Sequence, residues 1–203
     1  MIVKRLDDRF DLIYQWKNKK MKVLIGLALL CFNMALASNS VYQNGDIIFQ
    51  ESQSSQSRAI REATNSRWSH VGILFQNHGR WQVAEAVQPV RMTPLSSFIA
   101  RGKNRDYRIY RLPSLSETQK LELREQVAKV IGQNYDIYFE WSDDLIYCSE
   151  LVYKVFLRTT GIEIGTVQKY RDLNLGGPYV KQLIRKRIED TGRILNLDES
   201  IIT

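Results

Sequence analysis

Residues 70–87 read HVGILFQNHGRWQVAEAV, and this stretch decides the fold. Two apolar runs, His70–Phe75 and Trp81–Val87, flank the turn-rich segment Gln76–Arg80, a pattern typical of an antiparallel hairpin. If the loop holds an even number of residues, His70 and Glu85 point to the same side of the sheet, whereas an odd loop would send them to opposite faces. A carboxylate among the apolar residues of the second strand needs a partner, and His70 is the natural one.

Helices and strands surround this hairpin. The chain shows no internal repeat or composition break after Ser38, so residues 38–203 are expected to form a single domain. The mixture of helices with mainly antiparallel strands predicts an α+β fold. The expected elements are strands at Gly45–Gln50 and Tyr107–Leu112, a short helix at Ser54–Ala63, a helix from the capping box at Ser116–Gln119 to Gly132, and a basic amphipathic helix that begins at Pro178.

A further helix is expected to begin near Cys148. Polar residues from Ser142 lead into Leu151, Val152, Val155 and Phe156, which share one helix face. The partial positive charge at a helix start favours a thiolate, and a protonated His70 would favour it further. Unpaired backbone N–H groups at the same end would be suited to binding an oxyanion.

The N-terminal region predicts export. Basic residues around Lys22 precede an apolar run of about a dozen residues, and Ala35-Leu36-Ala37 is a small-x-small cleavage pattern, so residues 1–37 read as a signal peptide. The protein is then periplasmic or secreted. A retained membrane anchor is disfavoured because Asn33 interrupts the run, and a lipoprotein site at Cys31 is disfavoured by the bulky Leu30. Translation starts at Met21, or residues 1–20 extend the signal's basic region.

Cleavage changes what the composition implies. The 203 residues carry 29 Lys+Arg against 22 Asp+Glu, 44% hydrophobic residues and two cysteines, which excludes a disordered chain and a disulfide-dense miniprotein. The net charge of +7 invites a nucleic-acid partner, but seven basic and three acidic residues leave with the signal, so the mature charge is +3. No nucleic acid is therefore expected, and the basic C-terminal helix is a solvated face or a peripheral envelope contact.

One cysteine and two histidines are left in the mature chain for nucleophilic chemistry. His78 lies in the hairpin turn and is expected to be exposed, so by elimination Cys148 is the candidate nucleophile, His70 its base and Glu85 the group that orients the base. The alternative is a buried, inert cysteine with a structural histidine. These residues are too few for a zinc site unless carboxylates complete it, and residues 176–178 lack the lysine of a phosphate loop, so no metal or cofactor is expected.

An ordered series of motifs resembles a known family, the YiiX-type permuted papain-like cysteine hydrolases of the NlpC superfamily. The series comprises Gly45–Gln50, Ser69–Gly72, Glu85–Val87, Gly132–Asp136, Trp141–Asp144 and Tyr147–Val152. The histidine precedes the cysteine, as in the circularly permuted branch. The resemblance implies a papain-like α+β fold, an antiparallel sheet packed against helices, and a catalytic triad of Cys148, His70 and Glu85.

The resemblance also gives expectations for the substrate. It implies an amidase or peptidase that acts on a cell-wall peptide, with Tyr147, Tyr135 and Asp136 as further residues of the substrate site. A lipid-directed thiol acyltransferase or hydrolase, acting on a lipid-linked acyl or amide substrate, is the second reading, because the permuted branch also resembles lecithin:retinol acyltransferase-like enzymes and Trp68, Trp81 and Trp141 would suit an apolar cleft. A non-catalytic envelope-binding module is the third.

Overall fold

The computed structural model describes residues 41–203, and the signal peptide predicted at 1–37 and the start expected at Met21 lie outside this range. Residues Tyr42–Thr203 form one compact unit. Within the described range, no helix has the length and apolarity that crossing a membrane requires. The predicted α+β fold with an antiparallel sheet packed against helices is confirmed, and the sheet has five strands, one of which, β4 (Arg91–Pro94), was not expected.

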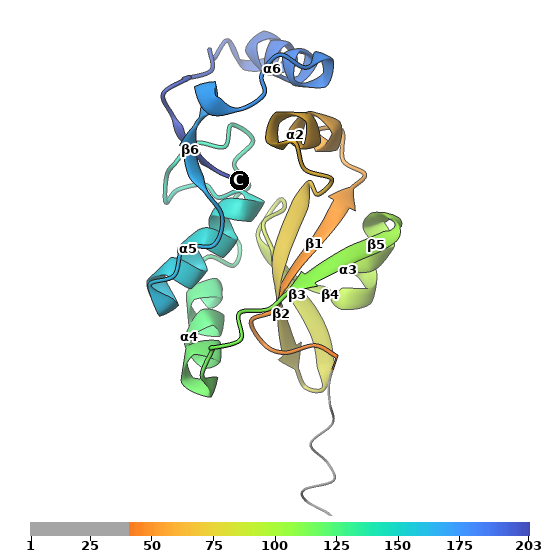
Figure 1. Cartoon of the computed structure of the whole chain (residues 1–203), viewed down its shortest axis with the longest axis vertical. Helices are drawn as coiled ribbons and strands as arrows, with labels where there is room; N and C mark the ends of the chain where they lie inside the picture. The colour runs from red at the N-terminus through yellow and green to blue at the C-terminus, as the bar shows by residue number, and fades with distance from the viewer. Residues whose placement is uncertain (1–40) are drawn as a thin grey trace, which may run out of the picture. The chain divides into compact units, whose positions relative to one another are not determined.

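The sheet carries the two strands of the hairpin at its centre. Its spatial order is β4-β3-β2-β1-β5 (Figure 1). All four pairings between neighbours are antiparallel. The strands are β1 (Ile47–Ser52), β2 (His70–Asn77), β3 (Arg80–Glu85), β4 (Arg91–Pro94) and β5 (Gly102–Tyr110).

The register of the hairpin shows whether its loop holds an even or an odd number of residues. The strands extend into the predicted loop until Asn77 pairs with Arg80, which leaves a two-residue turn of His78 and Gly79, both with positive φ. That is the turn geometry that suits the twist of a hairpin. Gly72 therefore pairs with Glu85, and because side chains two residues apart share a face, Glu85 lies on the same side as His70. A Cβ at Gly72 would come within 2.7 Å of the Ala84 carbonyl oxygen, so this close approach requires glycine.

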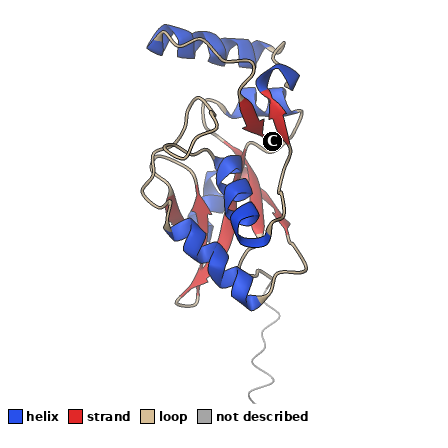
Figure 2. Ribbon diagram, turned by 90° about the vertical axis from the view of Figure 1, so that its left-hand side faces the viewer, coloured by secondary structure: helices blue, strands red, loops and turns tan. Residues whose placement is uncertain are grey.

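Helices cover both faces of the sheet. The helix α5 (Cys148–Thr160) packs against β2, and α4 (Glu117–Ala128) packs against α5, so that both lie in front of the strands in Figure 2. The short helix α3 (Leu95–Arg101) packs against β3, β4 and β5. The core between sheet and α5 is apolar, and it contains residues with no exposed surface such as Ile47, Ile73, Phe75, Leu151 and Phe156.

A second group of elements lies at the opposite end from α4, as Figure 1 shows. The helix α2 (Ser57–Thr64) packs against α6 (Pro178–Thr191). A small antiparallel pair, β6 (Val167–Lys169) and β7 (Ser200–Ile202), follows α5, with a 3₁₀ turn at Tyr170–Asp172. Ser149 at the start of α5 donates its hydroxyl to the Ile202 carbonyl at 2.8 Å, which ties the last strand to the cysteine helix.

Several boundaries differ from those expected. The predicted strand at Tyr107–Leu112 begins already at Gly102, and the helix expected to end at Gly132 ends at Ala128. The cap of α5 is Tyr147 rather than one of the polar residues from Ser142 onward. The capping box at Ser116–Gln119 and the helix that begins at Pro178 are confirmed.

Candidate active site

Cys148 is the first residue of α5 and a free, largely buried thiol, 7% exposed. Its helix begins there because the backbone of Tyr147 is extended, while the apolar face from Leu151 onward is buried against the sheet. The N–H groups of the first turn have no partner within the helix itself, and the helix dipole is positive at this end. This is the environment that stabilises a thiolate.

His70 is the first residue of β2, and its ring lies between an acid and the thiol. Its Nε2 lies 2.6 Å from Glu85 Oε2, and its ring stacks on Phe98 with centroids 5.7 Å apart. Burial alone lowers the pKa of His70, but hydrogen bonds to Cys148 and Glu85 outweigh it and raise that pKa to about 9. Because Glu85 engages Nε2, Nδ1 is the ring nitrogen left for the thiol. The imidazole is thus protonated at neutral pH.

Glu85 ends β3 with no exposed surface, and three partners satisfy its carboxylate. Besides His70, Thr93 Oγ1 donates to Oε1 at 2.5 Å, and Arg101 Nη2 donates to the same oxygen. Burial raises the pKa of Glu85, yet the hydrogen bond and charge of His70, with Thr93 and Arg101, bring it below its ordinary value. The acid is therefore ionised and fixed in direction, as a group that orients a base must be.

The three residues expected to bind substrate have different surroundings. Tyr147 is almost fully buried and its hydroxyl accepts the N–H of Ile202 at 2.9 Å. Tyr135 is partly exposed, accepts a hydrogen bond from Gln56 Nε2 at 3.0 Å, and interacts electrostatically with Cys148. Asp136 has no exposed surface, and its carboxylate accepts the N–H groups of Tyr138 and Glu140. Asp136 thereby shapes the loop that leads to Cys148.

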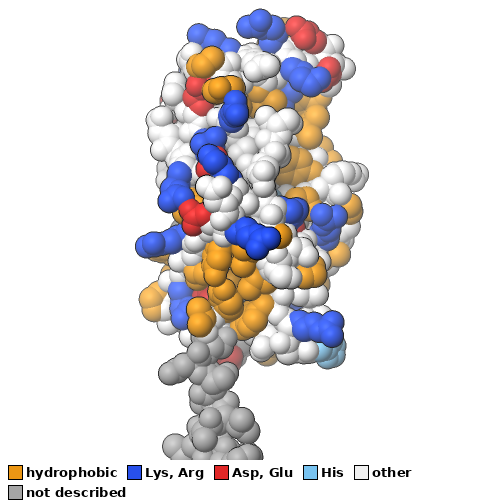
Figure 3. Space-filling model, turned by 90° about the vertical axis from the view of Figure 1, so that its right-hand side faces the viewer, with side chains coloured by type: hydrophobic (Ala, Val, Ile, Leu, Met, Phe, Trp, Pro, Cys, Tyr) orange, Lys and Arg blue, Asp and Glu red, His pale blue; other side chains and the backbone are white. Residues whose placement is uncertain are grey.

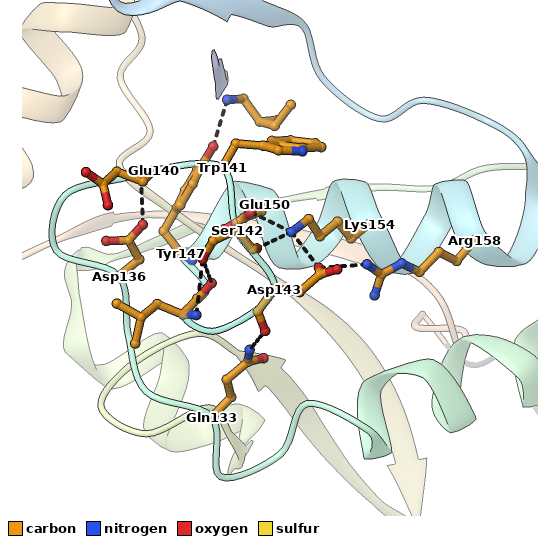
Figure 4. A network of polar contacts seen from close by, with 12 residues as sticks. Gln133, Asp136, Glu140, Trp141, Ser142, Asp143, Tyr147, Glu150, Lys154 and Arg158 are labelled. Atoms are coloured by element: carbon orange, nitrogen blue, oxygen red, sulfur yellow. Dashed lines mark hydrogen bonds and ion pairs between the residues drawn. The ribbon is translucent and has the colours of Figure 1, made fainter. Parts of the chain in front are cut away.

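A polar network fixes that loop against α5 (Figure 4). Lys154 is 8% exposed, and its Nζ lies 2.8 Å from Glu150 Oε1 and 2.8 Å from Asp143 Oδ1. Tyr147 N donates to Glu150 Oε2 at 3.3 Å. Burial raises the pKa of Glu150 to about 7, against the opposing effect of Lys154. The network therefore anchors the segment immediately before the cysteine.

Two pockets meet at His70. The first, about 290 Å³, contains Cys148 and is lined largely by apolar side chains, including Ile60 of α2, Leu173, and Leu183 and Ile184 of α6. The second, about 580 Å³, is lined mainly by glutamine and serine side chains with Tyr135 and Arg101. Of the three tryptophans expected at an apolar cleft, Trp68 lines the first pocket, whereas Trp81 packs on Tyr42 and Trp141 on Tyr153, so that expectation was wrong for two of them.

The sequence reasoning missed the residues that hold Glu85. Thr93 lies on β4 and Arg101 at the end of α3, two elements that were not expected between Pro89 and Pro94 or after them. Thr93 pairs with Val83, which is fully buried on the inner strand β3, and this pairing across strands leaves no local signal in the sequence. Arg101 has no local signal, since its contact depends on how α3 turns back over the sheet.

Three comparisons with known proteins agree. The chain matches, over residues 41–193, the model of the permuted papain-like amidase enzymes of the YaeF/YiiX, or C92, family. It is 40% identical over 162 residues to the uncharacterized protein YiiX of Escherichia coli K12, which covers 79% of each chain. A crystal structure described as the metalloprotein yiiX from Escherichia coli O157:H7 has a TM-score of 0.75 at 40% identity, covering 79% of this chain and 88% of the other.

Proposed function

The chain belongs to the YaeF/YiiX family of permuted papain-like amidases and is a cysteine hydrolase, and from this premise we propose that Cys148, His70 and Glu85 are its catalytic triad. One observation carries the proposal. His70, with a pKa of about 9, interacts with both the buried Glu85 carboxylate and the Cys148 thiol at the start of α5. A base held between an acid and a nucleophile is the arrangement that activates a thiol.

Acylation uses the proton stored on His70. The Cys148 thiolate attacks the carbonyl carbon of the amide, and the Sγ–C bond forms as the carbonyl oxygen becomes an oxyanion. The C–N bond then breaks, and the leaving amine takes the proton of the His70 imidazolium. Glu85 keeps Nε2 of the ring engaged, which holds Nδ1 toward the reacting atoms throughout.

Deacylation returns the enzyme to its starting state. His70, now neutral, takes a proton from a water molecule as the water oxygen attacks the thioester carbon. The S–C bond breaks, the carboxylic acid leaves, and the thiolate–imidazolium pair is restored. The backbone N–H groups at the start of α5 are placed to stabilise the oxyanion of both steps.

We assign the substrate to the cell envelope. The signal-peptide pattern at residues 1–37 supports export to the periplasm or beyond, where amide bonds of cell-wall peptides are available. The partly exposed Tyr135 reaches the polar side of the site, where a peptide backbone would bind. Export is tested by sequencing the N-terminus of the protein recovered from the periplasm, for which a mature start at Ser38 is expected.

Replacing the nucleophile tests the triad. Cys148→Ala is expected to abolish amide hydrolysis, by about 10³-fold or more, because no second thiol exists within the described residues. The free energy of unfolding should change little, since Ala fits the space of a small buried thiol. Hydrolysis of envelope fragments and urea denaturation, measured on both proteins, would give these two values. A variant that hydrolyses at the wild-type rate contradicts the assignment.

The apolar pocket favours a second candidate function, the hydrolysis or transfer of a lipid acyl group. Figure 3 shows hydrophobic side chains exposed below the charged side chains at the top of the molecule. In α6, Val180 is the buried residue, whereas Leu183 and Ile184 line the pocket and are half-buried. An apolar helix face of this kind is suited to covering an apolar ligand such as an acyl chain. Incubation with peptidoglycan fragments and with phospholipid vesicles in parallel separates the candidates by which one releases a product.

The description of the crystal relative as a metalloprotein raises the question of a metal in this chain. Among residues 41–203, no group of three or more His, Cys, Asp or Glu side chains converges in a way that would hold an ion. The Glu85 carboxylate is already engaged by His70, Thr93 and Arg101. The described residues do not fit a metal site, and neither acylation nor deacylation has a step through one.

A further inference from the structure

The polar pocket beside His70 has no role in the acylation and deacylation steps. Its walls are mainly carboxamide and hydroxyl side chains of β1, of the segment before α2 and of Gln88, joined by Tyr135, Arg101 and the apolar Ala86 and Val87. Its volume of about 580 Å³ lies in the range of small-molecule sites. The site therefore has room for a second part of the substrate, separate from the part in the apolar pocket.

The position of the polar pocket identifies which part that is. His70 lines both pockets, whereas Cys148 lines the apolar one. In the acyl-enzyme the acyl group is bonded to Sγ of Cys148, so it lies on the apolar side. His70 gives its proton to the amine, and because the acyl group occupies the apolar side, the amine lies toward the other pocket that His70 lines, which is the polar one.

The charged side chains that line the polar pocket are cations. Among the described residues that line it, His70 and Arg101 are the ones that carry charge, and no carboxylate lines it. Glu85 lies behind them with no exposed surface. A leaving group with a second ammonium would be repelled here, and one with an anionic group would be attracted.

The Arg101 guanidinium has further N–H donors that can bind an anionic group. Its Nη2 donates to Glu85, its guanidinium lies 5.9 Å from the Phe98 ring centre, and its side chain is 41% exposed. A guanidinium carries five N–H donors, and it binds carboxylate or phosphate through two of them at once. Gln53 Nε2 donates to the Arg101 carbonyl at 3.2 Å, which helps to hold the residue at the pocket wall.

We propose that Arg101 selects leaving amines that carry an anionic oxygen group, a carboxylate or a phosphate, in the polar pocket. This inference rests on the proposed triad, because the direction in which His70 gives up its proton places the amine. Arg101 is a specificity-determining residue in this account. The covalent step is unchanged: the C–N bond breaks, the amine gains the His70 proton, and the acyl group stays on Cys148.

Matched affinity labels test the selection without knowledge of the natural acyl group. Bromoacetylglycine and bromoacetylglycinamide differ in one charge, and in each the thiolate displaces bromide from the same CH₂ carbon. The rate constant of Cys148 labelling, followed by mass spectrometry, is expected to be about tenfold higher for the anion, as for a charge-assisted hydrogen bond. Bromoacetyl-phosphoethanolamine against bromoacetyl-ethanolamine forms the second arm, which separates phosphate from carboxylate.

Variants locate the effect. Arg101→Gln is expected to bring the ratio of the two labelling rate constants, anionic over neutral label, close to one. Arg101→Lys is expected to keep part of the ratio, because lysine retains the positive charge but lacks the paired N–H donors of a guanidinium. Arg108→Gln is the matched control, since Arg108 is exposed on β5 and lines neither pocket. In the wild type, raising the salt from about 10 mM to about 1 M should reduce the ratio by screening.

The outcomes separate this inference from the triad. A ratio near one in both arms of the wild type, or a ratio that Arg101→Gln leaves intact, overturns the inference. If labelling in those cases is still fast and still requires His70, the triad stands. Labelling no faster than that of N-acetylcysteine, with or without His70, contradicts the triad itself and removes the basis of the inference.

Discussion

At the scale of single residues, Glu85 is the group through which the site controls its histidine. Three donors hold the carboxylate, and two of them, Thr93 and Arg101, come from elements that follow Glu85 in the chain. Their effect is to keep a buried acid charged, and Cys148 and this charged acid together raise the pKa of His70. The positive charge that the proposed mechanism needs on the His70 imidazole therefore depends on Glu85, which contacts His70.

Neutralising this acid predicts a shifted pH profile. In the wild type the alkaline limb of kcat/KM should lie near pH 9, where His70 loses its proton. Glu85→Gln removes a negative charge that raises the pKa of His70, so the limb moves to lower pH and kcat/KM falls at least tenfold at neutral pH. A pH–rate profile of both proteins gives the comparison. Thr93→Val, which keeps the carboxylate, should move the limb less, and an unmoved limb in Glu85→Gln would refute the link.

At the scale of elements, two helix starts have different tasks. The start of α4 is a stabilising one, because Ser116 and Gln119 cap each other in a reciprocal capping box. The start of α5 carries Cys148, the proposed nucleophile, as its first residue, and the Glu150 carboxylate accepts the N–H of Tyr147. The same physics of unpaired N–H groups serves stability at one helix and chemistry at the other.

The first of these tasks gives a stability prediction without a change in activity. Ser116→Ala removes the hydroxyl that accepts Gln119 N–H at 3.2 Å, and the loss of such a cap lowers the free energy of unfolding by about 1 kcal/mol. The activity should not change, because Ser116 lines neither pocket of the site. Urea denaturation and a hydrolysis assay on the same preparation measure both. Lost activity at unchanged stability would contradict this division of tasks.

At the scale of the whole molecule, the elements that the sequence predicted are those with a local, periodic pattern of apolar residues. Alternation predicted the central hairpin, and one apolar helix face predicted α5, whereas Cys148, His70 and Glu85 became candidates by elimination and by the resemblance to a family. The edge strand β4 has four residues and ends in Pro94, and β6 and β7 have three each, too short for a periodic signal. Arg101 and the two pockets depend on contacts between distant segments, which a single sequence does not reveal.

The buried titratable groups predict how the stability of the whole molecule depends on pH. Burial raises the pKa of Glu150 from 4.5 to about 7, and partners raise that of His70 from 6.5 to about 9. In both cases the folded state binds more protons than the unfolded state, so the free energy of unfolding falls as pH rises through each window. Glu150→Gln should remove the part of this fall in unfolding free energy that lies between about pH 4.5 and pH 7, which amounts to about 3 kcal/mol. The part that His70 causes, which extends to about pH 9, should remain.

Urea denaturation from about pH 5 to about pH 9 measures this dependence. The matched control is Glu163→Gln, because Glu163 is an exposed acid that follows α5 and should leave the slope unchanged. If the free energy of unfolding of the wild type rises between about pH 5 and pH 7, Glu150 is not the group that binds the extra proton in the folded state.

The central claim is that Cys148 reacts as a thiolate held beside a protonated His70, and alkylation at acid pH tests it most directly. At about pH 6 an ordinary thiol is almost wholly protonated and reacts slowly with iodoacetamide. The account predicts that Cys148 is alkylated at least tenfold faster than N-acetylcysteine at this pH, and that His70→Ala removes the advantage while the protein stays folded. Alkylation of Cys148 at the rate of N-acetylcysteine, or at a rate that His70→Ala leaves unchanged, would contradict it.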